Sequence, residues 1–220
     1  MEILQPRNFC GVSERMLSVL PRRRSPGDSS YRWNKNPLTY CIASRLPGVS
    51  VDILDEAVAY GFAQWSAITP LEFQQVASTQ ADFLVLTRRI DGQNGVLAEH
   101  QLPPGNDMQL RGWIDMGEQW TLAMLKGVWT HELGHGIGIS HTDVPNSLMN
   151  AFWNPAIDTP QAWDISAAQG IYGPRRSPVP EPEPMPTPGT TPTGTNFVAT
   201  INIEKAGIYD VAFTRRVVQP

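Results

Sequence analysis

The sequence predicts an α/β domain over residues 29–173, from three observations. Between residues 50 and 68 apolar side chains recur at helical spacing and fall on one helix face: Val51, Leu54, Val58, Phe62 and Trp65. The run ADFLVLT (81–87) is nearly all apolar, which is typical of a strand covered on both sides. The stretch QWTLAMLKGVWTHELGHG (119–136) is long enough for another helix.

The remaining elements of this domain are shorter. LTYCIA (38–43) predicts a strand before the first helix, and GVLAEHQL (95–102) and GWIDM (112–116) predict two more. A last helix fits TPQAWDISAAQGIYG (159–173), with Thr159 as N-cap before Pro160. The expected order along the domain is therefore one strand, one helix, three strands and two helices.

Three further segments flank the domain. Residues 1–28 are a polar lead whose basic run, Arg22–Arg24, is either a solvated loop or an exposed processing site. Residues 174–196 are rich in Pro and Thr and predict an extended linker. Residues 197–220 alternate as two strands, which are marginal alone, so they either dock on something or begin a larger domain.

Charge and hydropathy exclude some classes. The net charge of −4 and the pI near 5.5 argue against nucleic acid or an anionic membrane as the main partner. No apolar run approaches the ~18–20 residues of a transmembrane helix. The first residues lack a secretory signal, so the signal was removed, export uses another route, or the protein stays inside the cell.

Three of the four histidines lie in THELGHGIGISH (130–141). On a helix, His131 and His135 project from one face, a turn apart, so two imidazoles can hold one ion at ~2.0–2.1 Å. Gly138 allows a left-handed turn that ends the helix and returns His141 as a third ligand. Chance packing rarely gives this spacing, so we interpret it as a zinc site.

Three protein ligands with one open position are typical of a catalytic zinc. Glu132 lies beside the first ligand, where it can reach a water on the metal without binding the metal itself.

The pattern His-Glu-x-x-His-x-x-Gly-x-x-His resembles the metzincin peptidases, whose signature ends in a methionine turn, here Met149. Thr142 after the third histidine resembles the matrix metalloproteinase (matrixin) branch. The likeness covers roughly 31–173, including YRWNKNPLTYCI, the first helix with its Trp and Thr-Pro-Leu-x-Phe, ADFLVL and AWDISAAQGIYG.

This resemblance implies a twisted, mostly parallel five-stranded sheet, an antiparallel edge strand over the cleft, and three helices. It implies a zinc endopeptidase in which Glu132 is general base for the metal-activated water and Met149 forms a hydrophobic floor. Leu97 and Ala98 would pair with an extended peptide, and Phe152 and Trp153 would line the specificity pocket without the family's Pro-x-Tyr. We expect a secreted monomer that acts on a protein or peptide.

The chain departs from the matrixin pattern at its other metal sites. The loop that carries two ligands of the family's structural zinc is missing, and the other two positions hold Glu99 and Trp113, so we expect one zinc only. The neighbouring calcium site keeps three acids, which are either hard oxygen ligands or ordinary surface acids: Asp91, Asp115 and Glu118.

Cys10 raises the question of latency. PRNFCGVSE resembles the family's prosegment motif, in which a thiolate takes the open position on the zinc, although two residues separate Arg7 from the cysteine. The alternatives are a Cys10–Cys41 disulfide or two ordinary thiols.

Two other functions compete with a peptidase made as a zymogen. One is a non-catalytic zinc-dependent peptide-binding module or self-inhibited decoy, which the intact Glu132 disfavours. The other is a carrier whose Pro-linked tail docks a partner.

Overall fold

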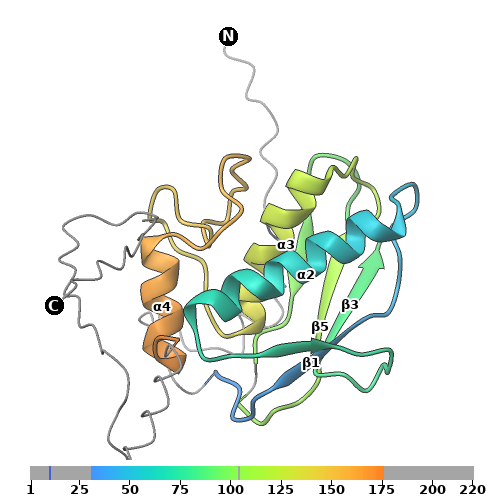
Figure 1. Ribbon diagram of the computed structural model, residues 1–220. Helices are drawn as coiled ribbons and strands as arrows, with labels where there is room; N and C mark the ends of the chain where they lie inside the picture. Colours follow the sequence, from blue (N-terminus) through green and yellow to red (C-terminus); the bar gives the residue numbers. More distant parts are fainter. Residues whose placement is uncertain (1–9, 11–30, 104, 176–220) are drawn as a thin grey trace, which may run out of the picture. The chain divides into compact units, whose positions relative to one another are not determined.

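The computed structural model describes residues 10, 31–103 and 105–175 (Figure 1). Our predictions for residues 1–28 and 197–220 lie outside this part of the chain, apart from Cys10. Those for the 174–196 linker do so too, beyond its first two residues. From residue 31 onward the described residues form one α/β unit, and the domain bounds of 29–173 stay a prediction.

The sheet has five strands in the order β2-β1-β3-β5-β4. β1 pairs in parallel with β2 and β3, and β3 pairs in parallel with β5. β4 is antiparallel to β5 and forms one edge. The expected mixed sheet with an antiparallel edge strand is thus confirmed, over Leu38–Ile42 (β1), Phe73–Gln75 (β2), Phe83–Arg88 (β3), Ala98–His100 (β4) and Leu110–Asp115 (β5).

Three helices accompany the sheet: α2 (Val51–Ile68), α3 (Leu122–Gly136) and α4 (Ala162–Tyr172). Ser50 caps α2 and Thr121 caps α3 through side-chain oxygens that accept a backbone N–H. The prediction of Thr159 as the cap of α4 is wrong: the cap is Gln161, because its N–H donates to Asp164 at 2.8 Å. None of the described helices has the length and apolarity needed to cross a bilayer.

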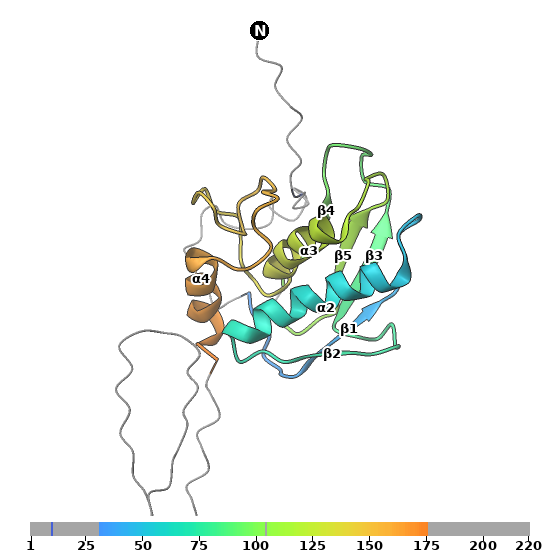
Figure 2. The ribbon, with the colours of Figure 1, turned by 45° about the horizontal axis from the view of Figure 1, so that its top comes forward.

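Aromatic packing joins α2 to the sheet. Phe62 stacks on Tyr40 with ring centroids 4.0 Å apart and meets Phe73 and Phe83 edge-on or tilted. These rings belong to the main core, which also contains Trp65 and Trp129. Apolar burial on this scale fixes α2, and α3 packs beside it (Figures 1 and 2).

The C-terminal half of α3 is anchored by polar side chains from elsewhere in the fold. Trp65 Nε1 donates to the Thr130 carbonyl at 2.8 Å, and Trp33 Nε1 donates to the Gly136 carbonyl at 2.9 Å. The Tyr172 hydroxyl donates to the Ile137 carbonyl at 2.9 Å. All three bonds hold the helix in place, and those to Gly136 and Ile137 satisfy carbonyls that the helix itself leaves open. Figure 2 shows β4, the sheet edge, next to this helix.

Candidate metal centre

The three motif histidines converge through the same ring nitrogen. The Nε2 atoms of His131 and His135 are 3.2 Å apart, and each lies 3.2 or 3.1 Å from His141 Nε2. Two nitrogens held ~2.0–2.1 Å from a tetrahedral zinc are about 3.3 Å apart. The triangle therefore has the size of three corners of a zinc tetrahedron.

The local chain path explains this convergence. His131 and His135 lie one turn apart on α3, and the helix ends where Gly138 takes a φ of +97°. A Cβ on residue 138 would lie 2.1 Å from the Tyr31 carbonyl oxygen, so both conformation and space require glycine there. The chain then turns back and brings His141 against the other two rings.

Hydrogen bonds orient two of the rings. His131 Nδ1 lies 2.6 Å from the Leu148 carbonyl and His135 Nδ1 lies 2.8 Å from the Ile139 carbonyl. A carbonyl only accepts, so each Nδ1 carries the proton and each Nε2 presents a lone pair to the cluster.

Burial keeps these imidazoles neutral. Loss of solvent lowers the pKa of His131 to about 4 and that of His141 to about 3, the latter helped by the charge of His131. Burial, with the charges of His141 and His131, also lowers the pKa of His135 well below its ordinary value. Neutral imidazole is the form that binds a metal.

Glu132 lies beside the cluster in an environment that suits a cation. Its side chain is fully buried, and neither carboxylate oxygen has a hydrogen-bond partner among the described residues. Burial raises the pKa of Glu132 to about 8, against the opposing effect of Cys10 and with a smaller contribution from Glu99. A buried carboxylate without partners is costly unless a positive charge lies close by.

Cys10 joins the cluster from the N-terminal segment. Its Sγ lies 3.6 Å from His135 Nε2, and its backbone N–H donates to the Ala151 carbonyl at 3.0 Å. One ligand atom each from Cys10 and the three histidines lies within 4.8 Å of the others. Burial and Glu132 raise the pKa of the thiol. Both cysteines are free, and Cys41 is buried against the Ala77 carbonyl, so the alternative of a disulfide between them is wrong.

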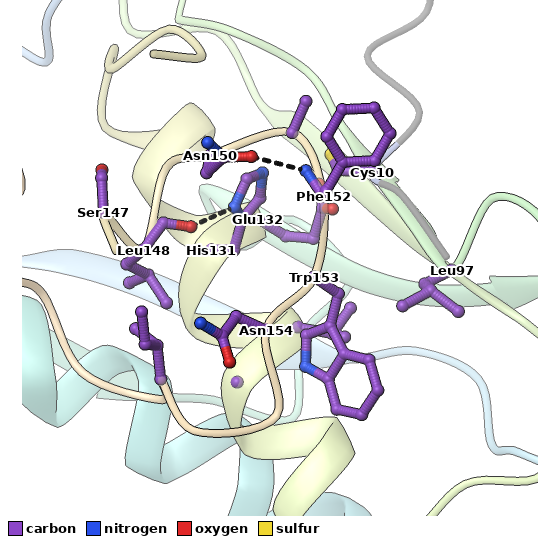
Figure 3. Close-up of a pocket in the computed structure, with 14 residues that line it drawn as sticks. Cys10, Leu97, His131, Glu132, Ser147, Leu148, Asn150, Phe152, Trp153 and Asn154 are labelled. Atoms are coloured by element: carbon purple, nitrogen blue, oxygen red, sulfur yellow. Dashed lines mark hydrogen bonds between the residues drawn. The ribbon is translucent and has the colours of Figure 1, made fainter. Parts of the chain in front are cut away.

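A pocket of about 360 Å³, part of it open to solvent, adjoins the cluster. Its lining includes the predicted Leu97, Phe152 and Trp153 together with Cys10, His131 and Glu132. Figure 3 shows these labelled side chains around it, with the bond from His131 to Leu148. Gly127 also lines it, and a Cβ there would lie 3.3 Å from Trp153 Nε1.

On the edge strand, the two residues predicted to pair with a peptide, Leu97 and Ala98, point their backbone groups to opposite sides. The Leu97 carbonyl accepts the Asp115 N–H at 2.9 Å and the Gln101 N–H donates to Arg111 at 3.0 Å, so these residues face β5. Because strand residues alternate, the N–H and C=O of Ala98 face the open edge of the sheet. The Ala98 side chain does not line the pocket and packs near Val128.

Met149 is fully buried, and its sulfur lies against Gly134, the residue before the ligand His135. A Cβ on Gly134 would lie 2.3 Å from its sulfur, which explains why this helical position is glycine. Asp164 was not among the predicted site residues, yet its buried carboxylate accepts the Leu148 and Met149 N–H groups at 2.8 and 3.1 Å. No local pattern marks such a residue, because its partners lie 15–17 positions earlier in the chain.

The two positions left from the family's structural zinc are engaged otherwise. Glu99 and Trp113 are partners across β4 and β5, Arg88 forms an ion pair with Glu99, and its guanidinium carbon lies 4.6 Å from the Trp113 ring centroid. This contact joins the edge strand to β3 and β5. The expected absence of a second zinc stays a prediction.

The three acids assigned to calcium bind backbone amides. Asp115 accepts the N–H groups of Ile90, Gly92 and Gly117, while Asp91 accepts from Val96 and Glu118 from Asn94. Burial acts to raise the pKa of Asp115, but these amide bonds lower it overall. Within the described residues the acids do not form a converging ligand group, so calcium binding stays a prediction.

The chain is similar to known matrixins. The matrixin family model, Peptidase_M10, matches residues 32–173. An interstitial collagenase from Sus scrofa is 35% identical over 80% of this chain and 38% of its own length. Matrix metalloproteinase-20 from Homo sapiens is 33% identical over 79% of this chain and 37% of its own length. Matrix metalloproteinase-C from Caenorhabditis elegans is 29% identical over 74% of this chain and 32% of its own length. The match thus spans less than two fifths of the length of these relatives, and it shows that the chain belongs to the matrixin family.

Proposed function

We propose that the protein is a zinc-dependent endopeptidase that hydrolyses peptide bonds of proteins or peptides, with Cys10 holding a latent form. The observation that carries the proposal is the triangle of Nε2 atoms with the unpartnered Glu132 carboxylate beside it. Membership of the matrixin family supports the same reaction.

The donor set fits zinc. Three neutral imidazoles, two of them with Nδ1 already bonded to a carbonyl, leave their Nε2 lone pairs facing one another. Lone pairs that converge at 3.1–3.2 Å repel unless a cation lies between them. Bound there, zinc would supply a Lewis acid that polarises the scissile carbonyl and eases deprotonation of its water.

Glu132 would move the proton. Its carboxylate is buried next to the ligand His131, and once Cys10 has left the site no described residue competes for the proton of the attacking water. It would then deliver that proton to the leaving nitrogen. A cation in the cluster favours the ionised carboxylate, which is the form that acts as a base.

The substrate would bind as an added strand. The open backbone groups of Ala98 offer one donor and one acceptor to an extended peptide, as in other cases of strand addition. The neighbouring pocket would take one side chain of that peptide between Leu97, Trp153 and α3. Substrate position would thus be set by β4 and by the segment after Met149.

Cys10 would block this arrangement. Its sulfur lies against the ligand nitrogens, and its N–H donates to the carbonyl of Ala151, which also lines the pocket. A thiolate is a good zinc ligand and would fill the position that the attacking water needs. In the full chain, Cys10→Ser is expected to raise hydrolysis of a fluorogenic peptide, with Cys41→Ser as the matched control. Equal activity of the wild type and Cys10→Ser would count against latency.

Glu132→Gln separates the peptidase from a binding module or decoy. The amide keeps the shape but lacks the base, so kcat/KM in the Cys10→Ser chain is expected to fall by ~10²–10⁴. Zinc content, measured by atomic absorption, is expected to stay the same. Unchanged turnover would refute the role of Glu132, and peptide binding without turnover in the parent chain would favour the decoy.

A further inference from the structure

We propose that Asp164 on α4 is a positioning residue that controls the metal ligand His131 through a single peptide group. The inference rests on the zinc site proposed above. It concerns the strength and geometry with which that site holds a metal.

Asp164 is a carboxylate in an unusual setting. Its side chain is fully buried, and its partners in the described part of the chain are neutral donors: Ser147 Oγ, Leu148 N, Met149 N and Gln161 N. A buried carboxylate needs such bonds to offset its lost hydration. Four donors gathered on one side chain hold the segment before and after Leu148 against the start of α4.

One of these donors belongs to the peptide group that contacts His131. The peptide between Leu148 and Met149 donates its N–H to Asp164 Oδ1 at 3.1 Å. The carbonyl of the same peptide accepts from His131 Nδ1 at 2.6 Å. Carboxylate, peptide and imidazole therefore form one chain of hydrogen bonds that ends at the ligand nitrogen Nε2.

This chain has a chemical consequence for the metal. The negative charge polarises the peptide and makes its carbonyl a stronger acceptor for His131. A stronger acceptor fixes the tautomer and raises the basicity of the opposite ring nitrogen, as a carboxylate bonded directly to a ligand histidine does. His135, by contrast, bonds to the Ile139 carbonyl in the turn that follows its own helix.

The same bonds position the methionine. Met149 N–H also lies 3.1 Å from Ser147 Oγ, and the Met149 carbonyl accepts the Thr142 N–H at 3.0 Å. Thr142 follows the ligand His141 directly. A shift of the 147–149 segment would therefore disturb two of the three ligands.

Two substitutions and one control separate this role from simple packing. Asp164→Ala leaves buried N–H groups without an acceptor. Asp164→Asn keeps the shape and one acceptor oxygen but removes the charge, so Met149 N–H faces an amide instead of a carboxylate oxygen. Ser147→Ala removes one hydroxyl from the same buried site and leaves the bonds from Leu148 and Met149 to Asp164 intact.

The experiment measures metal binding by the full chain, so it needs no turnover. Zinc affinity is measured by competition with a chromophoric chelator, the Co²⁺ absorption spectrum reports ligand geometry, and near-UV circular dichroism reports folding. Asp164→Ala is expected to lose ~10–100-fold in zinc affinity with an altered cobalt spectrum. Asp164→Asn is expected to fall between it and the wild type, and Ser147→Ala to stay closest to the wild type.

Each result decides the matter. If Asp164→Ala does not fold, the folded Asp164→Asn gives the answer. Wild-type zinc affinity and cobalt spectrum in Asp164→Asn would overturn the proposal, and so would an equal loss in Ser147→Ala. Tight zinc binding by a Cys10→Ser chain that cleaves no peptide would refute the proposed function and leave this inference standing. No zinc binding by the wild type would overturn both.

Discussion

His100→Phe is expected to change the acid stability of the protein. The His100 side chain is 3% exposed and lies between the rings of Phe83 and Trp129, with each centroid 5.9 Å away. Its Nδ1 bonds to the Gln101 carbonyl at 2.7 Å, while its Nε2 has no partner among the described residues. Burial lowers the pKa of His100 to about 4, although the bond to Gln101 opposes this.

The sign follows from the two pKa values. The unfolded chain takes up a proton on His100 as the pH falls through ~6.5, while the folded chain does so only near 4. The stability that neutral His100 contributes to the folded chain is therefore fully present above pH 6.5 and is lost as the pH falls toward 4. At pH 4 the free energy of unfolding has fallen by roughly 3 kcal/mol, which follows from the pKa values of His100 in the unfolded and the folded chain.

The assay is urea denaturation of the metal-free wild type and His100→Phe between pH 7.5 and 4. The three ligand histidines are present in both chains, so their titration cancels in the difference. Phenylalanine keeps an aromatic ring beside Trp129 and is only slightly larger than histidine, so the substitution opens no cavity. Between pH 7.5 and 4 the wild type should lose about 3 kcal/mol more than the variant. Parallel curves would refute a buried neutral His100.

Two further substitutions test the geometry of the site. Gly138→Ala forces a Cβ against Tyr31 at a φ of +97°, so the free energy of unfolding, from urea denaturation, should fall by ~1–3 kcal/mol. Zinc affinity should fall with it, because the turn brings back His141; an unchanged affinity would contradict this. Trp153→Ala removes one wall of the pocket, so cleavage of a peptide library should shift toward larger side chains by ~10-fold or more. An unaltered cleavage pattern would show that Trp153 does not limit the pocket.

The central helix could be predicted from the sequence because its signal is local. Ligand spacing on α3, the turn at Gly138 and the return of His141 lie within eleven residues, and short-range geometry governs all of them. The apolar period over 50–68 likewise predicted α2, with Ser50 as the N-cap rather than as a helical residue. The arrangement of the strands came from the family resemblance, since β2 has only three residues and no periodicity of its own.

The supports of the site could not be predicted, because they depend on contacts distant in sequence. No local pattern marks Asp164 as the partner of Leu148 and Met149. Its bond to the Gln161 N–H also explains why α4 is capped at Gln161 and not at the predicted Thr159. Gly134 looks unfavourable in a helix until the sulfur of Met149 is placed against it.

The most direct test of the peptidase account is hydrolysis of a mixed peptide library by the Cys10→Ser chain. It would be measured as purified, after removal of zinc by a chelator, and after zinc is restored. A zinc-dependent peptidase is expected to show cleavage that disappears with the chelator and returns with zinc. Cleavage that continues without metal, or no cleavage with one zinc bound to the cluster, would contradict it.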